Sequence, residues 1–392
     1  MPITSNQNTL YPRRQFIQST TAVALAPLLT RAPKAFAQSA DSMPTAEVIE
    51  TQIISNFSDA YHGWPTLMRR RNGELLVVCS GGRERHVCPF GRVEMIRSRD
   101  DGRTWTFPQV VIDGPIDDRD AGACETPAGN LLVTTFTSLA YEPELQKLTG
   151  DQLVRWQGVH QRLNEKQRTE ELGVWMLRSE DGGHTWSQRY PCIVNSPHGP
   201  VALRDGRILY AGVGLWEKDR RVGVAVSQDD GKSWDWLAEI PVRGGDESKN
   251  YHELHLVECA SGKLLVHIRN HNTANAQETL QCESTDGGLT WSEPHAIGVW
   301  GLPSHLLRLK DDRLLMTYGY RRQPFGNQAR LSSDEGKTWS AAMTISADGA
   351  GGDLGYPSTV QLDSGELYSV WYERLADKPG AVLRAARWKT AE

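Results

Sequence analysis

A tyrosine and a glutamate far apart in the chain are the residues best suited to nucleophilic chemistry. Tyr356 and Glu253 each stand at the start of a short apolar stretch. A phenol with a pKa of about 10 is a weak nucleophile unless a neighbouring carboxylate takes its proton. A neutral phenol also approaches an anionic substrate without the repulsion that an ionised Asp or Glu would meet. The pair predicts attack on an acidic substrate if the fold brings it together; otherwise Tyr356 is a rim aromatic that stacks on a sugar.

Arginines recur at matching places along the chain. Arg83, Arg269, Arg321 and Arg374 each follow an apolar, strand-like stretch. A guanidinium group offers a planar donor fork that fits a carboxylate in two-point contact. A single such arginine is more simply explained by a neighbouring acid. Three or four in register predict an anion-binding pocket.

Further polar side chains stand at or near the starts of the stretches that precede these arginines. They are His62, Asp118, Arg119, Asp120, His198, His252 and His305. Asp118 and Asp120 are candidate proton donors, because Asp can act as a general acid when its pKa is raised. Arg119 and the four histidines are candidate substrate-binding groups.

A repeated turn motif indicates how these residues are positioned. The pattern Ser-x-Asp-x-Gly-x-(Thr/Ser)-Trp occurs five times, at 98–105, 179–186, 227–234, 284–291 and 332–339. In a hairpin the Asp side chain accepts backbone N–H bonds, the Gly takes a positive φ angle, and the Trp folds back as an apolar plug. These Asp boxes are therefore predicted to be structural rather than catalytic.

A second repeat alternates with the Asp boxes. Six copies of a short apolar strand, a Gly or Asp turn and a strand that opens with Leu or Ile occur at 64–76, 121–132, 199–209, 254–265, 306–315 and 359–368. Hairpin plus box gives a four-stranded unit of about 50 residues, the size of a propeller blade. The sequence predicts an all-β, six-bladed β-propeller over residues 45–392. Val48–Ser55 is expected to complete the sixth blade and close the ring.

The blade architecture explains why distant residues should meet. The innermost strand lines the central channel and the second strand runs antiparallel to it, so the start of the first and the end of the second lie on one rim. Tyr356, Glu253 and the arginines all occupy such positions. We therefore expect them to surround one axial pocket.

One interval does not follow the repeat. Residues 141–172 are rich in Glu, Gln, Lys and Arg, with apolar residues near helical spacing. We expect a helical insertion in blade two, which either packs or dimerises, or forms a wall over the binding site.

The N-terminal segment is expected to be an export signal. Residues 1–37 lack Asp and Glu, contain Arg13-Arg14 followed by the apolar run 22–29, and end in Ala35-Phe36-Ala37. This order predicts a twin-arginine signal, a linker over 38–44, and a periplasmic or secreted product. No later stretch approaches the length of a membrane span. Charge is nearly balanced, at 43 basic and 48 acidic residues, and no basic cluster is dense enough to follow a nucleic-acid backbone, so we expect no nucleic-acid partner.

These motifs resemble the bacterial sialidase superfamily, the BNR or Asp-box propellers, over essentially all of residues 45–392. The resemblance implies an arginine triad that holds a substrate carboxylate, a Tyr/Glu pair that attacks, and an acid/base residue. Gly355-Tyr356-Pro357 matches the nucleophile segment, and Glu253 with Arg269 matches the helper Glu and the second triad Arg. Arg321, just before the fifth box, matches the third.

The first blade departs from that family pattern. The stretch expected to supply the first triad Arg is His62-Gly63-Trp64-Pro65, and the loop expected to bear the acid/base Asp, residues 82–89, contains no Asp. Arg83 or Arg85 is the substitute expected in the clamp. His86 is the substitute for the acid, with Asp118 or Asp120 as alternatives, since a His with a pKa near neutrality does general acid–base work.

The leading hypothesis is an exo-acting glycoside hydrolase that releases a terminal sialic acid or related acidic sugar from a glycan, without metal or cofactor. Its partners would be sialylated or other acidic glycans. Two alternatives stay open on the same fold. One is a polysaccharide lyase on uronic acids, with Tyr or His as base. The other is a glycan-binding propeller that has lost activity.

Overall fold

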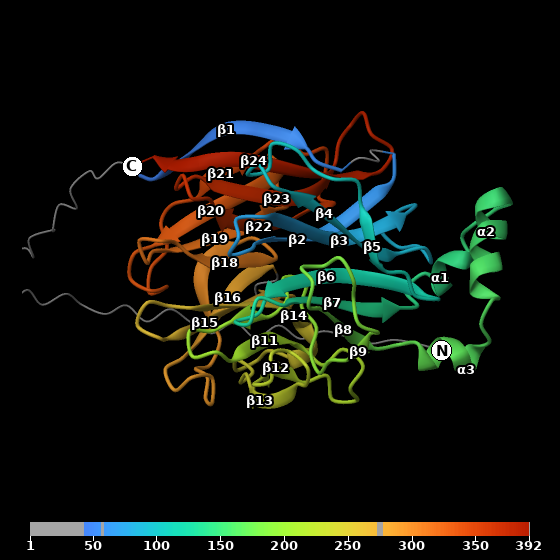
Figure 1. The fold of residues 1–392 in the computed structure, drawn as a ribbon, viewed down its shortest axis with the longest axis horizontal. Coiled ribbons are helices and arrows are strands. Elements are labelled where there is room, and N and C mark those ends of the chain that lie inside the picture. The colour runs from blue at the N-terminus through green and yellow to red at the C-terminus, as the bar shows by residue number, and fades with distance from the viewer. Residues whose placement is uncertain (1–42, 56–58, 273–276, 392) are drawn as a thin grey trace, which may run out of the picture. The chain divides into compact units, whose positions relative to one another are not determined.

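A computed structural model describes residues 43–55, 59–272 and 277–391. The predicted export signal and residues 38–42 of the predicted linker lie outside these residues. The described chain forms six antiparallel sheets, each of four strands (Figure 1). Each sheet is one blade, and the predicted six-bladed β-propeller is confirmed.

The first five blades each follow the chain from the innermost to the outermost strand. Blade one holds β2 (Tyr61–Arg69), β3 (Leu75–Arg83), β4 (Arg92–Ser98) and β5 (Gln109–Ile112); blade two holds β6 (Asp117–Glu125), β7 (Leu131–Ser138), β8 (Val174–Ser179) and β9 (Tyr190–Pro191); blade three holds β10 (Val201–Ala202), β11 (Ile208–Val213), β12 (Val222–Ser227) and β13 (Asp235–Glu239). Blade four holds β14 (Tyr251–Glu258), β15 (Leu264–Asn270), β16 (Glu278–Ser284) and β17 (His295–Trp300); blade five holds β18 (Ser304–Arg308), β19 (Leu314–Tyr320), β20 (Gly326–Ser332) and β21 (Met343–Ser346).

The sixth blade joins the two ends of the described chain. It contains β22 (Leu354–Gln361), β23 (Leu367–Arg374), β24 (Ala381–Ala391) and, outermost, β1 (Thr45–Ile53). β1 pairs antiparallel with β24 from Thr45↔Ala391 to Ile53↔Arg384. The early strand thus supplies what the sixth repeat lacks, as the sequence predicted.

The hydrophobic core is divided among the interfaces between blades. Six apolar clusters are each shared by two neighbouring blades, which closes the ring. In the cluster between blades six and one, Val77 packs with Val370 and Leu383, all fully or almost fully buried. Both faces of each sheet are therefore covered, which explains why β11 and the first five residues of β3 are continuous apolar runs.

The Asp boxes are turns between the third and fourth strands. In the first box, Asp100 accepts hydrogen bonds from the Ser98 hydroxyl at 2.8 Å and from the Thr104 hydroxyl at 2.6 Å. Gly102 has a φ angle of 84°, a backbone conformation that favours glycine, and the Trp105 indole N–H donates to its carbonyl at 3.1 Å. These bonds satisfy the turn internally, as a structural role requires.

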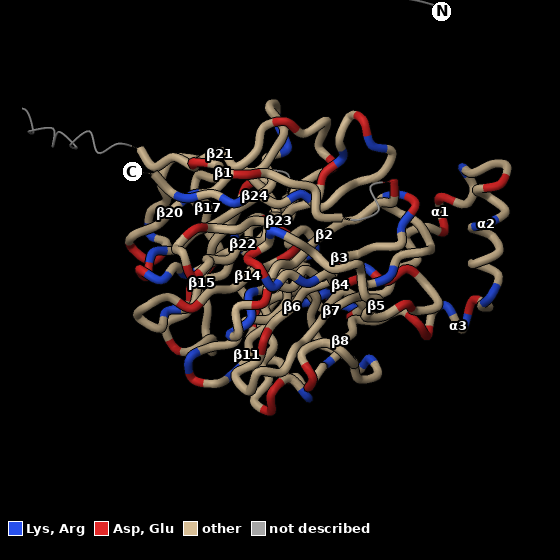
Figure 2. The backbone as a smooth tube through the Cα atoms, turned by 45° about the horizontal axis from the view of Figure 1, so that its top comes forward, with Lys and Arg blue, Asp and Glu red and all other residues tan. Residues whose placement is uncertain are grey.

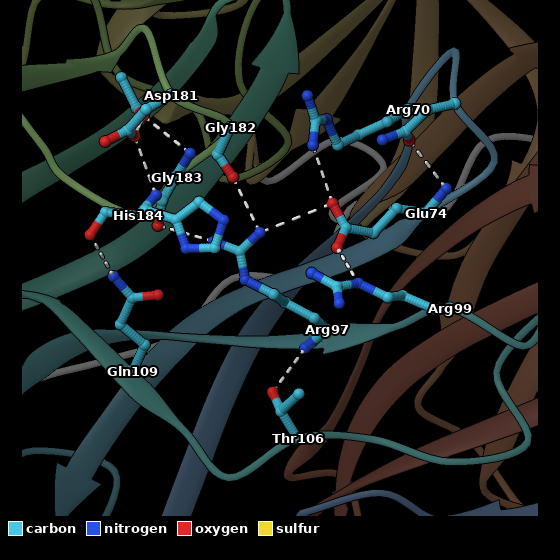
Figure 3. Close-up of polar contacts among 12 residues, drawn as sticks. Arg70, Glu74, Arg97, Arg99, Thr106, Gln109, Asp181, Gly182, Gly183 and His184 are labelled. Carbon is cyan, nitrogen blue, oxygen red and sulfur yellow. Dashed lines mark hydrogen bonds and ion pairs between the residues drawn. The ribbon is translucent and has the colours of Figure 1, made fainter.

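Boxes also tie neighbouring blades together. Arg97 of blade one donates to the carbonyls of Gly182 at 2.8 Å and Gly183 at 2.6 Å, in the second box (Figure 3). The same guanidinium lies 3.5 Å from the Glu74 carboxylate. The contact links the outer part of one sheet to the turn of the next, at the rim opposite the starts of the innermost strands.

The interval 141–172 is helical, as predicted. It contains α1 (Glu142–Leu145), α2 (Gly150–His160) and α3 (Glu165–Glu170), which stand beyond the ends of the strands on the right of Figure 1. A short 3₁₀ helix (Ser248–Asn250) precedes β14. Because the insertion joins the end of β7 to the start of β8, it lies on the same rim as the starts of the innermost strands.

Four innermost strands share an unusual bend. Trp64, Asp120, Glu253 and Tyr356 have φ angles of 51°, 49°, 38° and 55°. At each of them the register between the first and second strands shifts. A non-glycine residue in this region costs about 1–3 kcal/mol, and such strain gathers at functional sites. The bulges re-aim four side chains at equivalent points of four blades.

Charge is mixed across the propeller. Lys and Arg positions are interspersed with Asp and Glu positions along the tube (Figure 2). Within the described residues, no helix is both long and apolar enough to cross a membrane.

Candidate active site

Tyr356 and Glu253 meet at the axial rim. The Tyr356 hydroxyl donates to one oxygen of the Glu253 carboxylate. Arg269 donates from Nη1 to that hydroxyl at 2.9 Å and to the other oxygen of Glu253. Glu253 and Arg269 are brought together by β14 and β15, because the bulge at Glu253 falls opposite Arg269 in the register of the two strands. A phenol, a carboxylate and a guanidinium thus form one closed hydrogen-bonded unit.

The electrostatics of this unit fix its protonation. Burial opposes ionisation of Glu253, but the Arg269 charge and the bonds from Arg269 and Tyr356 outweigh it and lower the carboxyl pKa. Burial and the Glu253 charge raise the pKa of Tyr356 well above its ordinary value. The resting state is therefore a neutral phenol beside a carboxylate, which suits transfer of the phenolic proton to Glu253.

Arg321 flanks the tyrosine on the side of blade five. Its Cζ lies 5.8 Å from the centre of the Tyr356 ring, and its Nε donates to the Leu354 carbonyl at 3.0 Å. This bond orients the guanidinium, and within the described residues its terminal nitrogens have no ion-pair partner. A fork held from behind in this way is available to an anion.

Trp64 occupies the place where blade one would supply an arginine. Its indole is 2% exposed. Arg119 lies over the ring with its Cζ 4.6 Å from the centroid, and Arg83 lies 5.1 Å away. Stacking on Trp is favourable for a guanidinium and leaves its edge free to donate.

Arg83 and Arg119 differ in their partners. Arg83 is fully buried and binds Asp117 through Nη1 at 2.5 Å and through Nη2 at 3.1 Å. Arg119 is 3.9 Å from the same carboxylate, and its Nε is buried without a hydrogen-bond partner in the described chain. The Arg83 guanidinium is thus already engaged, whereas Arg119 has unused donors.

Asp120 and Asp118 point to different surroundings. Burial raises the pKa of Asp120 to about 7, with Glu253 raising it further and Arg119 opposing. One of its oxygens is buried without a hydrogen-bond partner in the described residues. Asp118 instead accepts from the Gly114 amide at 2.6 Å. Of the two aspartates, Asp120 is the one coupled to the Tyr356 unit.

His86 lies on the loop between β3 and β4, half-exposed, beside an acid and two tyrosines. Its Nδ1 is 3.0 Å from Asp353 and 2.8 Å from the Tyr61 hydroxyl. Tyr372 also donates to Asp353 at 3.0 Å. The Tyr372 ring is 5.8 Å from that of Tyr356, so this second cluster adjoins the first. The burial of Asp353 is outweighed by these bonds, which lower its pKa.

The remaining predicted histidines lie around this centre or away from it. The rings of His252 and His271 lie 4.7 Å apart at a tilt of 50°, and His271 is 2.7 Å from Arg269 Nε, so this pair borders the site. His62 turns toward Glu94, 3.8 Å away. His198 and His305 meet in the channel with ring centroids 5.1 Å apart, and each also packs against His255.

Sequence reasoning missed four members of the site. They are Trp64, Asp353, Tyr61 and Tyr372. A signal for Trp64 was present, because Gly63-Trp64-Pro65 repeats the Gly-aromatic-Pro order of Gly355-Tyr356-Pro357. Among the described residues, no group of three His, Cys, Asp or Glu side chains is arranged to hold a metal.

Comparison with models of known protein families identifies the family of this propeller. Residues 140–369, more than half of the chain, match the model described as a BNR repeat-like domain. The chain belongs to the BNR repeat-like family. The resemblance predicted from the Asp boxes is thereby confirmed. No curated protein sequence matches this BNR propeller.

Solved structures share the fold at low sequence identity. A protein of unknown function from Dyadobacter fermentans is 22% identical, with a TM-score of 0.73 over 88% of this chain and 99% of its own. The Hadza microbial sialidase Hz136 is 17% identical, with a TM-score of 0.61 over 85% of this chain and 66% of its own. The NanB sialidase of Streptococcus pneumoniae is 13% identical, with a TM-score of 0.62 over 88% and 70%. The BNR propeller thus has a sialidase-like fold.

Proposed function

We propose that this BNR propeller is an exo-acting glycoside hydrolase that releases a terminal sialic acid or a related acidic sugar from a glycan. The observation that supports it most is the closed unit in which the Tyr356 hydroxyl donates to Glu253 and accepts from Arg269. Sialidases use a tyrosine nucleophile in place of the usual second carboxylate. The unit supplies a nucleophile, its base and a cation for the substrate in one place.

Recognition of the acidic group falls to three guanidinium groups. Arg269 and Arg321 stand on either side of Tyr356, and Arg119 approaches from blade two across Trp64. Charge-assisted bonds from several forks hold and orient a carboxylate. Arg119 takes this role in the proposal in place of Arg83, because Arg83 is committed to Asp117.

The reaction proceeds by two displacements. Tyr356 attacks the anomeric carbon as its proton passes to Glu253, and the glycosidic oxygen leaves with a proton from His86. A water, deprotonated by His86, then attacks the anomeric carbon, and Tyr356 departs and recovers its proton from Glu253. The configuration is retained overall. Asp353 orients the His86 ring through Nδ1, so that Nε2 serves the proton transfers.

Asp120 serves binding in this scheme. With a pKa raised by burial to about 7, it is largely protonated below neutrality and donates a hydrogen bond without repelling the acidic substrate.

Turnover of two substrate types tests the proposal. The protein with residues 1–37 removed is incubated with a fluorogenic aryl sialoside and, separately, with a uronate polymer. Release of the fluorophore, lost in Tyr356→Phe, supports the hydrolase. An unsaturated, ultraviolet-absorbing product from the uronate polymer would instead support the lyase. Tight binding of sialylated glycan without turnover would support a glycan-binding propeller.

A further inference from the structure

The loop that carries His86 is bound by the helical insertion of blade two. We propose that this insertion fixes the position of His86, and that Glu84 is the positioning residue through which it acts. The catalytic part of this inference rests on the proposed function. The structural part, that Glu84 holds the loop, stands independently of it.

Glu84 is the main polar link between the loop and α2. Its carboxylate accepts from Trp156 Nε1 at 2.9 Å, from Arg155 Nη2 at 2.9 Å and Nε at 3.1 Å, and from Gln152 at 3.3 Å. The three donors are three or four residues apart or adjacent on α2, so they share one side of the helix. Partial burial opposes ionisation, but these bonds lower the pKa of Glu84 and keep it charged.

The residue after Glu84 adds a second link. The Arg85 guanidinium lies over the Trp156 ring at 4.5 Å and 3.7 Å from Glu144 at α1. Arg85 also donates from Nε to the Val87 carbonyl at 3.3 Å, which bends the loop around His86. Glu84 and Arg85, the two residues before His86, are therefore both held by the insertion.

Apolar packing anchors the other end of the loop. Cys88 is completely buried in a cluster with Tyr141, Leu148 and Trp156, which come from the insertion. Trp156 is also completely buried, so it joins the polar and the apolar contacts. A side chain of this size packed on one face and bonded at its N–H is a rigid support.

An inner anchor completes the clamp. Arg83 Nη2 donates to the His86 carbonyl at 3.0 Å, and Arg83 itself is fixed by Asp117. His86 thus lies between a buried ion pair of the propeller and the outer helices, with its ring on Asp353. A displacement of about 1 Å can cost on the order of 10²-fold in rate. The insertion would therefore determine whether the His86 ring stands close enough to the glycosidic oxygen to protonate it.

Two variants test the clamp without emptying the core. Glu84→Gln removes the charge that Arg155 binds, and Trp156→Phe removes the N–H donor while it keeps an aromatic ring. Glu170→Gln is the matched control, because Glu170 is an exposed carboxylate of the same insertion paired with Lys166 at 3.7 Å. Hydrogen exchange of residues 83–90 is measured for each, together with kcat on an aryl sialoside and on sialyllactose.

The two substrates separate a loss of proton donation from a general loss of activity. An aryl leaving group needs little protonation, whereas the sugar hydroxyl of sialyllactose needs it. We expect Glu84→Gln and Trp156→Phe to speed exchange at 83–90 and to lower kcat on sialyllactose about tenfold more than on the aryl sialoside. The control should change neither.

Unchanged exchange at 83–90 in both variants would overturn the inference. So would faster exchange with equal losses on both substrates, because the loop would then move without affecting the acid. A wild-type protein that cleaves neither substrate would instead overturn the proposed function. In that case exchange at 83–90 still decides whether Glu84 holds the loop.

Discussion

The Tyr356 hydroxyl lies 2.9 Å from Nη1 of Arg269. The same nitrogen donates to Glu253, whose carboxylate also accepts the hydrogen bond from the Tyr356 hydroxyl. When the phenolic proton moves to Glu253, negative charge develops on an oxygen that already faces a guanidinium. A preorganised cation of this kind stabilises developing charge without reorganisation. The arrangement therefore favours ionisation of the tyrosine during attack rather than at rest.

Removal of the tyrosine hydroxyl should stop chemistry and preserve binding. Tyr356→Phe keeps the ring beside Arg321 and leaves Glu253 paired with Arg269. We expect kcat on an aryl sialoside to fall at least about 10³-fold. The affinity for the free acidic sugar, measured by calorimetry, should change by less than about tenfold. A variant that retains a tenth of wild-type kcat would show that another group attacks.

The architecture was predictable because it repeats. Five copies of a turn motif and six hairpins reveal a period that no single segment would show. The end-to-end pairing of β1 with β24 followed from a missing strand in the last repeat. The core between the blades was predictable as well, because apolar strands of blade length are buried on both faces once the blades stand in a ring.

The centre of the site was predictable from the same period. Tyr356, Glu253 and Arg269 occupy repeat positions that a propeller brings to one rim, so their meeting required no knowledge of side-chain packing. The choice between Arg83 and Arg119 did require it. Asp117 precedes Arg119 by only two residues, yet it pairs closely with Arg83 from the neighbouring blade. Such partner choice depends on side-chain direction at a bulge, which a linear pattern does not contain.

Two arginine variants should separate binding from stability. Arg83→Met leaves the carboxylate of Asp117 buried and poorly compensated, which we expect to cost about 3–5 kcal/mol of unfolding free energy. Arg119→Met keeps an apolar side chain over Trp64 and should cost less than about 1 kcal/mol. On the aryl sialoside, Arg119→Met should raise KM about tenfold or more.

Urea unfolding and steady-state kinetics measure the two effects. The assignment of Arg119 to the substrate would be wrong if Arg119→Met lowered stability as much as Arg83→Met and left KM unchanged.

The three histidines packed together in the channel should make stability depend on pH. Burial lowers the pKa of His305 from its ordinary value of 6.5 to about 3, and the rings of His198 and His255 lie against it with centroids 5.1 Å and 4.5 Å away. Between these values the unfolded chain binds the proton and the folded one does not, so this contribution falls as pH falls from 6.5. His305→Gln should therefore lose less stability on acidification, by about 2 kcal/mol at pH 5.

Denaturant unfolding at pH 7.5 and pH 5 checks this difference between wild type and His305→Gln. If the unfolding free energy of wild type and of His305→Gln changed equally between pH 7.5 and pH 5, the neutral, buried state of His305 would be contradicted. Any constant loss of packing energy in His305→Gln cancels, because each protein is compared with itself at the two pH values.

The protonation state of Asp120 makes the sharpest distinction between the two candidate acids. Burial raises its pKa to about 7, and ionisation would place a second negative charge near Glu253. If Asp120 binds substrate as a neutral acid, kcat/KM should decline as pH rises through about 7, since this ratio reports the free enzyme. Asp120→Asn keeps a neutral hydrogen-bonding group, so it should retain activity within about tenfold and shift that decline to higher pH.

His86→Asn should instead lose more kcat on sialyllactose than on the aryl sialoside. Should Asp120→Asn show that leaving-group dependence and His86→Asn lack it, the proton donor is Asp120, because an amide cannot protonate the glycosidic oxygen.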